Sequence, residues 1–183
     1  MRKIISVFSI LFFAMTAVHA ANKVSVKYGP VKFKATSGAV AASVGSKTQI
    51  SLGGGSRKGS GTFNIFLEAS EVAQLAKGVT FDVVGDGEDF DGDNAVLILF
   101  QGTKTKGSGF NTITYGYTSS HETTAEGTFK VISYDEATRT LKFILVAKAS
   151  PYVLSKAKIG SSQSNTTVTK ALPIKIAGTV ILP

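Results

Sequence analysis

Apolar and polar residues alternate with a period of two through most of the chain after residue 21. The segment 23–28 reads KVSVKY, and the segment 31–35 reads VKFKA. Such alternation is typical of a β-strand with one buried and one exposed face. Further alternating or continuous apolar runs lie at 48–52, 62–68, 79–84, 95–101, 112–118, 128–134, 140–148 and 174–182.

So many strands exceed what one open sheet usually holds, because sheets of this kind split or close on themselves. The sequence therefore predicts an all-β fold: an antiparallel β-sandwich of roughly 8–10 strands, with a barrel as the alternative. Pro30 lacks a backbone donor, which predicts that residues 23–35 form a bent edge strand. The polar interval 134–138 predicts a hairpin between residues 128 and 148.

The alternation is interrupted by one helical segment and by three loops. Residues near 70–77 are predicted to form one short helix, with Ser70 as its N-cap. Intervals rich in small residues predict long loops at 53–61, 102–109 and 155–170.

The first twenty residues have the organisation of an export signal. Arg2 and Lys3 precede an apolar run over 4–17. That run is shorter than the roughly 20 residues that a helix needs to span a bilayer, so it fits a cleaved signal peptide better than an anchor. We predict a signal peptide over 1–20 and a single β-sandwich domain over 21–183, with no transmembrane segment after cleavage.

The composition excludes several kinds of chemistry, and the charged residues are unevenly distributed along the chain. The chain has no cysteine, which removes disulfides, thiolate metal sites and a cysteine nucleophile. Loss of Arg2 and Lys3 with the signal lowers the formal charge from +8 to +6. Residues 22–60 contain seven basic side chains and no acid, whereas residues 61–95 contain eight acids and one lysine.

This uneven charge leaves two interpretations open. The charged side chains are either ordinary solvated strand faces, or surfaces through which copies of the chain associate or an envelope polysaccharide binds. No motif for nucleic acids accompanies the charge, so we expect no nucleic-acid partner.

The segment 82–94 is the densest polar cluster and holds half of the acids in the chain. Its spacing of carboxylates and glycines suits an irregular calcium site, although the glycine and glutamate that an EF-hand requires are absent. A solvated acidic turn and a pair of catalytic carboxylates are the alternatives. The candidate metal ligands are Asp86, Glu88, Asp89, Asp91 and Asp93.

Two tyrosines are candidates for ligand binding. Tyr115 and Tyr117 fall on one face of the strand predicted at 112–118, where they either pack in the core or stack on a sugar ring.

Nothing in the sequence specifies a catalytic site. His121 is the one histidine left after loss of the signal, and its serine neighbours on an extended chain point to opposite faces. Glu68 or Glu122 with the acidic segment would supply the two carboxylates of a glycosidase.

The sequence therefore predicts an exported, non-enzymatic β-sandwich that acts by binding or assembly at the cell envelope or outside the cell, with no certain cofactor. A calcium-stabilised carbohydrate-binding or adhesion module is the first alternative, and a small carboxylate-dependent hydrolase is the second.

Overall fold

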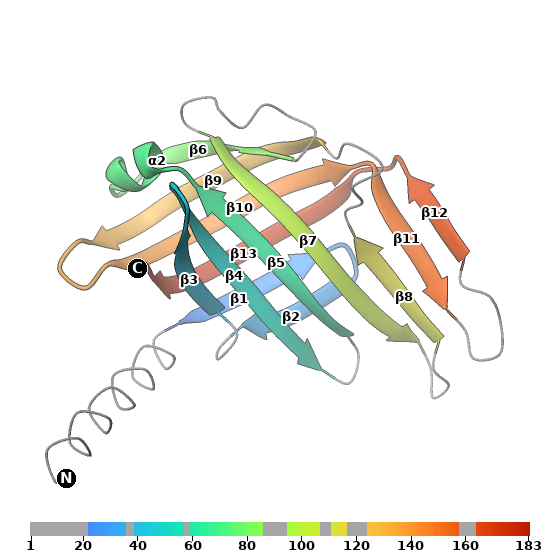
Figure 1. The fold of residues 1–183 in the computed structure, drawn as a ribbon. Helices are drawn as coiled ribbons and strands as arrows, with labels where there is room; N and C mark the ends of the chain where they lie inside the picture. The colour runs from blue at the N-terminus through green and yellow to red at the C-terminus, as the bar shows by residue number, and fades with distance from the viewer. Residues whose placement is uncertain are drawn as a thin grey trace, which may run out of the picture.

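A computed structural model describes residues 22–35, 39–56, 59–85, 95–106, 111–116, 124–157 and 164–183. The predicted signal peptide lies outside these residues. The described chain forms thirteen strands and one short helix (Figure 1). These are β1 Lys23–Tyr28, β2 Val31–Ala35, β3 Ala39–Val44, β4 Lys47–Ser56, β5 Gly59–Leu67, α2 Ala69–Ala73, β6 Thr80–Val84, β7 Ala95–Lys106, β8 Asn111–Gly116, β9 Thr124–Asp135, β10 Thr140–Ser150, β11 Tyr152–Ala157, β12 Ser164–Val168 and β13 Leu172–Ile181.

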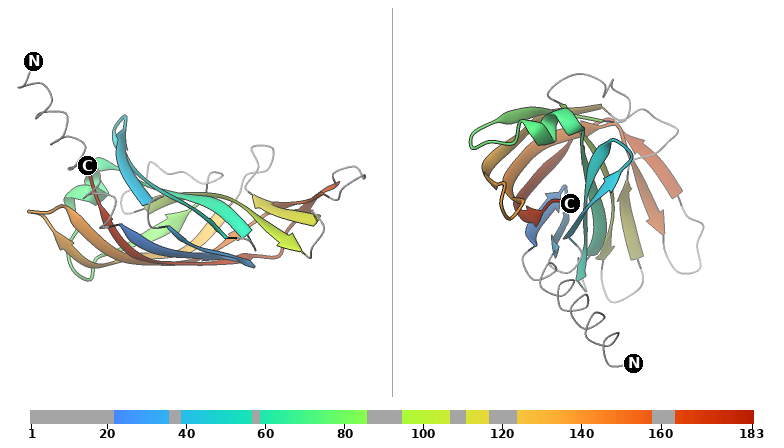
Figure 2. Two further views of the ribbon diagram at one scale, coloured as in Figure 1. Left: turned by 90° about the horizontal axis from the view of Figure 1, so that it is seen from below. Right: turned by 60° about the vertical axis from the view of Figure 1, so that its left-hand side comes forward.

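The strands form two layers of one continuous sheet. The front layer has the order β3-β4-β5-β7-β8-β11-β12, and the back layer has the order β6-β9-β10-β13-β1-β2. The layers are joined where β6 pairs in parallel with the start of β7, whereas the other pairings among the described strands are antiparallel. Strands of the two layers cross at a steep angle, and the sheet is nearly closed like a barrel (Figures 1 and 2). The prediction of an all-β, antiparallel fold is thereby confirmed.

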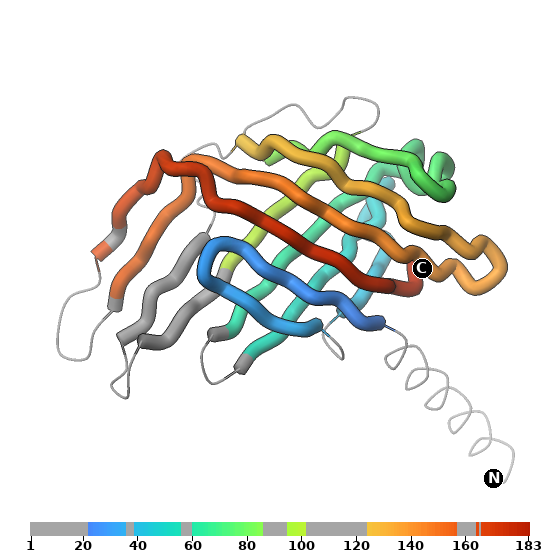
Figure 3. Tube along the Cα trace, turned by 180° about the vertical axis from the view of Figure 1, so that it is seen from behind, coloured from blue at the N-terminus to red at the C-terminus, as the bar shows by residue number. Residues whose placement is uncertain are grey.

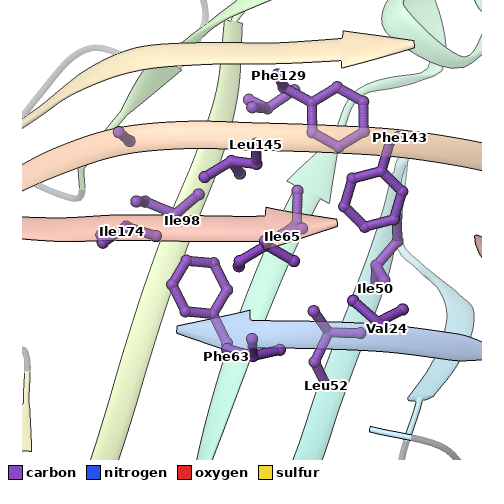
Figure 4. Close-up of a cluster of buried hydrophobic side chains, with 14 of the residues drawn as sticks. Val24, Ile50, Leu52, Phe63, Ile65, Ile98, Phe129, Phe143, Leu145 and Ile174 are labelled. Atoms are coloured by element: carbon purple, nitrogen blue, oxygen red, sulfur yellow. The ribbon is translucent and has the colours of Figure 1, made fainter. Parts of the chain in front are cut away.

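The space between the layers is filled by the apolar side of the alternating pattern (Figure 4). In β1 the burial pattern is strictly alternate, with Val24, Val26 and Tyr28 turned inward. Aromatic rings pack within this core: Phe129 and Phe143 stack with centroids 4.9 Å apart. Burial of each large side chain contributes about 1.5–3 kcal/mol, so the core stabilises the fold without disulfides.

A hydrogen bond links the two layers near the middle of the core. The Tyr28 hydroxyl, on β1, donates to the carbonyl oxygen of Gln101 on β7 at 2.6 Å. Burial raises the pKa of the Tyr28 phenol far above its usual range. The hydroxyl therefore stays neutral and serves as a permanent donor between the layers.

Two close contacts join the back layer to the front layer where residue 22, β2 and β13 meet β3 and β4. We call this junction the seam. The Asn22 side chain donates to the Ala39 carbonyl at 2.7 Å and accepts from the Ile181 N–H at 2.8 Å. Gly54 on β4 lies against β2, because a Cβ at this position would be 2.6 Å from a ring carbon of Phe33. The seam thus depends on one buried amide and on the absence of a side chain at residue 54.

Several local predictions were wrong in detail. The expected loops at 53–61 and 102–109 are largely strand, because β4, β5 and β7 continue through their glycines as paired ladders. The expected loop 155–170 contains β12 and the end of β11. These segments lack the alternation by which strands are recognised, so backbone pairing in the folded chain determines their structure.

The predicted edge strand is confirmed only in part, whereas the predicted hairpin is confirmed. The strand β2 lies at one end of the back layer, as predicted, but β1 is interior because β13 pairs with its other side. The predicted hairpin is confirmed as β9 and β10, joined by a turn in which Asp135 accepts from the N–H groups of Ala137 and Thr138.

The predicted short helix is present, but α2 begins one residue earlier than the predicted 70–77 and ends already at Ala73. Glu68, not Ser70, is the N-cap of α2, and its N–H donates to the Glu71 carboxylate at 2.7 Å. This reciprocal capping box satisfies orphan backbone donors that a serine hydroxyl was expected to satisfy.

Asn22→Ala should destabilise the protein more than removal of an amide elsewhere. The substitution leaves the Ile181 N–H and the Ala39 carbonyl without their side-chain partner. We therefore expect the free energy of unfolding, measured in urea, to fall by about 2–3 kcal/mol. Asn64→Ala, which removes a part-buried contact with Gln49, is the control and should cost about 1 kcal/mol or less. Equal losses for the two variants would contradict the role assigned to Asn22.

Candidate functional site

The charged side chains on the outward side of four neighbouring strands in the back layer are all lysines. The strands β2, β1, β13 and β10 expose seven lysines and carry no acidic residue. Figure 3 views the molecule from the side on which these strands lie. We call this surface the lysine face; its lysines are Lys23, Lys27, Lys32, Lys34, Lys142, Lys148 and Lys175.

The strand register aligns three of these lysines directly. Lys27 is opposite Lys32 on one side and opposite Lys175 on the other. Residues opposite one another in an antiparallel sheet point to the same face, with Cβ atoms about 4.5–5.5 Å apart. Three like charges therefore follow one another across three strands, an arrangement that opposes folding.

Acidic residues begin only at the border of the lysine face. Glu126 on β9 is opposite Lys148, and Asp82 on β6 is opposite Thr128. Among the described residues, none of the seven lysines forms a salt bridge; the ion pair found there joins Lys47 and Glu68 at 2.9 Å. The lysines of the face thus have no ion-pair partner within 4.0 Å among the described residues.

Two open hollows lie on the lysine face. The larger, of about 470 Å³, is lined by three lysines (Lys27, Lys148 and Lys175), by one acid, Glu126, and by apolar residues that include Val146 and Pro173. The smaller, of about 310 Å³, lies between Lys23 and Lys34. Val146 is 49% exposed, which is unusual for a large apolar side chain in the described structure. Each hollow offers apolar contact beside positive charge.

The acidic segment proposed as a calcium site is outside the described residues, and with it Asp86, Glu88, Asp89, Asp91 and Asp93. Within the described ranges, no group of three His, Cys, Asp or Glu side chains is placed to hold a metal ion.

The two candidate ligand-binding tyrosines are only partly placed. The backbone of Tyr115 lies in β8, opposite Gly102 and Leu154, and Tyr117 falls outside the described residues. The interpretation of these tyrosines as core or as a stacking platform stays a prediction.

Of the candidate catalytic residues, only Glu68 is described. Its carboxylate pairs with Lys47 and accepts from the Ser46 hydroxyl at 3.3 Å, and the residue also caps α2. These contacts give Glu68 a structural role. His121 and Glu122 are outside the described residues.

Part of the lysine face is visible in the sequence, and part depends on topology. The basic block at 22–60 contains the lysines of β1 and β2. Lys148 and Lys175 belong to a second basic block, because residues 137–183 contain seven basic side chains and no acid. They join the lysines of β1 and β2 on one surface because β13 lies between β1 and β10. Alternation does predict that each of these lysines is exposed, but it does not predict which strands are neighbours.

Comparison of the chain with models of known families, with curated proteins and with solved structures finds no match. No helix in the described ranges is long and apolar enough to cross a membrane.

Lys27→Thr should stabilise the protein, because it removes the central charge of the three-lysine row. We expect the free energy of unfolding to rise by about 0.5–1 kcal/mol at low ionic strength. The gain should shrink in high salt, where exposed charges are screened.

Lys156→Thr on β11 is the matched control, because it makes the same substitution at an exposed strand position outside the face. Chemical denaturation at two salt concentrations measures both variants. An equal gain for Lys156→Thr would show that strand propensity, and not repulsion, explains the effect.

Proposed function

We propose that this protein is an exported, non-enzymatic binding protein that holds an anionic polysaccharide of the cell envelope on its lysine face. The observation that carries the proposal is the cross-strand row Lys32–Lys27–Lys175, set in a face without acids. A row of like charges opposes folding and is relieved when an anionic ligand lies across it. The predicted signal peptide supports export.

The shape of the face favours a polymer over a small anion. The lysines are spread over four strands and do not converge on one enclosed pocket. Adjacent strands are about 4.8 Å apart, so the row spans about 10 Å with one charge per strand. This spacing is comparable with the length of one sugar residue, which lets successive charged units meet successive lysines.

The two hollows favour a polysaccharide over an anionic polymer that has no sugar rings. The larger hollow combines aliphatic atoms of Val146 and Pro173 with three lysines and one acid, Glu126, and the smaller lies between Lys23 and Lys34. The apolar face of a sugar ring fits such a surface, while its carboxylate or sulfate meets a lysine. The alternatives that depend on the acidic segment and on the tyrosines gain no support from the described residues.

The triple variant Lys27→Gln, Lys32→Gln, Lys175→Gln should lose polymer binding. The test uses the chain from Ala21 to Pro183, sodium polygalacturonate as probe and isothermal titration calorimetry. At about 1 kcal/mol for each lysine near an anionic surface, we expect the affinity to fall on the order of 100-fold. Binding by the unaltered protein should also weaken steeply as salt is raised.

The control is a second triple variant with the same loss of charge outside the lysine face: Lys77→Gln, Lys156→Gln, Lys170→Gln. It should retain affinity within about threefold. Equal losses for the two triple variants, or no binding of any polyuronate or sulfated polysaccharide, would overturn the proposal. Tighter binding of duplex DNA than of polygalacturonate would assign the face to nucleic acid instead.

A further inference from the structure

The strand β3 has an open edge with the properties of a pairing surface. Strand pairing in the described structure leaves three strands with one partner each, namely β2, β3 and β12. Exposed edges invite pairing with another chain, and charged residues usually block it. Lysines at 32 and 34 protect β2, and β12 has the polar sequence SNTTV. The sequence of β3, AVAASV, contains no charge and no proline.

The outward side of β3 is also apolar. Val40 is 43% exposed and Val44 is 50% exposed, and both belong to the same side of the strand as Ala42. The chain is exposed on both sides from Ala42 to Ser46, where the hairpin of β3 and β4 stands away from the layers (Figure 2). A second chain therefore has access to the edge from Ala42 onward, whereas at the start of β3 the Ala39 carbonyl already accepts from the Asn22 side chain.

We propose that β3 pairs with β3 of a second copy of this chain, antiparallel and around a two-fold axis, to form a dimer with a continuous front layer. In an antiparallel pair, two opposite residues either both direct their N–H and C=O groups toward the partner strand or both direct them away from it. Since these directions alternate along a strand, two identical strands can pair only in registers that place odd residues opposite odd ones and even opposite even.

Among these registers, one joins the exposed valines. When Ala42 lies on the two-fold axis, Val40 of each copy is opposite Val44 of the second copy. The four valines then form two cross-strand pairs on one face, which is the favoured combination for β-branched residues. A register centred on Ala41 would place Val40 opposite Ala42 and leave Val44 without an apolar neighbour.

This dimer differs in mechanism from association of oppositely charged faces. The nearest described charges, Lys47 and Glu68, already pair with each other. The contact is a short ladder with a small apolar area, so we expect a dissociation constant on the order of micromolar or weaker. It should be little affected by salt, whereas binding of an anionic polymer to the lysine face should be strongly affected.

Sedimentation velocity on the chain from Ala21 to Pro183, from about 1 to about 500 µM, tests the dimer directly. The unaltered chain should shift from monomer to dimer over this range. Val40→Lys with Val44→Lys should stay monomeric, because two pairs of lysines would then oppose each other. Val146→Lys is the matched control: its valine is 49% exposed, but it lies in the back layer, and dimerisation should persist.

A charge-paired variant tests the register. Val40→Glu with Val44→Lys places Glu opposite Lys twice in the proposed register, so the dimer should return and should weaken in high salt. Circular dichroism and melting temperatures verify that all variants fold.

The dimer is overturned if the unaltered chain is monomeric at every concentration, or if the double-lysine variant still dimerises. Failure of the Glu–Lys variant alone would overturn the register centred on Ala42. None of these results depends on whether a polysaccharide binds.

Discussion

The pairing of β1 between β13 and β2 is the constraint on which both the core and the lysine face depend. Its register turns Val24, Val26 and Tyr28 into the core and turns the intervening lysines outward. A slip of one residue would reverse every side chain of the strand and bury lysines, which is far more costly than loss of a few contacts. The burial that drives folding therefore also fixes the row of three lysines.

The energetic roles of the two faces are opposite. The inner face contributes the apolar burial and the Tyr28–Gln101 hydrogen bond. The outer face contributes repulsion, since Lys27 has a lysine on each side. Repulsion between exposed charges costs tenths of a kcal/mol per pair, whereas each buried large side chain contributes several times more. The core is thus large enough to tolerate the repulsion between lysines on the outer face.

The sequence predicts the strands that alternate and misses those that do not. β1, β2 and the β9–β10 hairpin follow from pattern and turn chemistry. Half of β3 is alanine, and four of the five residues of β12 are polar, so neither strand shows a clear alternation of large apolar and polar residues. The same limit applies to the site. Exposure of each lysine follows from alternation, but the meeting of Lys27 with Lys175 follows from chain topology, which a single sequence does not encode in any local pattern.

The lysine face and the β3 edge lie on different layers, and this separation has a consequence for binding. Pairing through β3 extends the front layer and leaves the outward side of β1, β2, β10 and β13 uncovered in both copies. A dimer would then present two lysine faces to one polymer chain. The second contact becomes intramolecular once the first has formed, which strengthens attachment without any new residue contact. Weak pairing through β3 and modest affinity at each lysine face would together suffice to hold a long anionic chain.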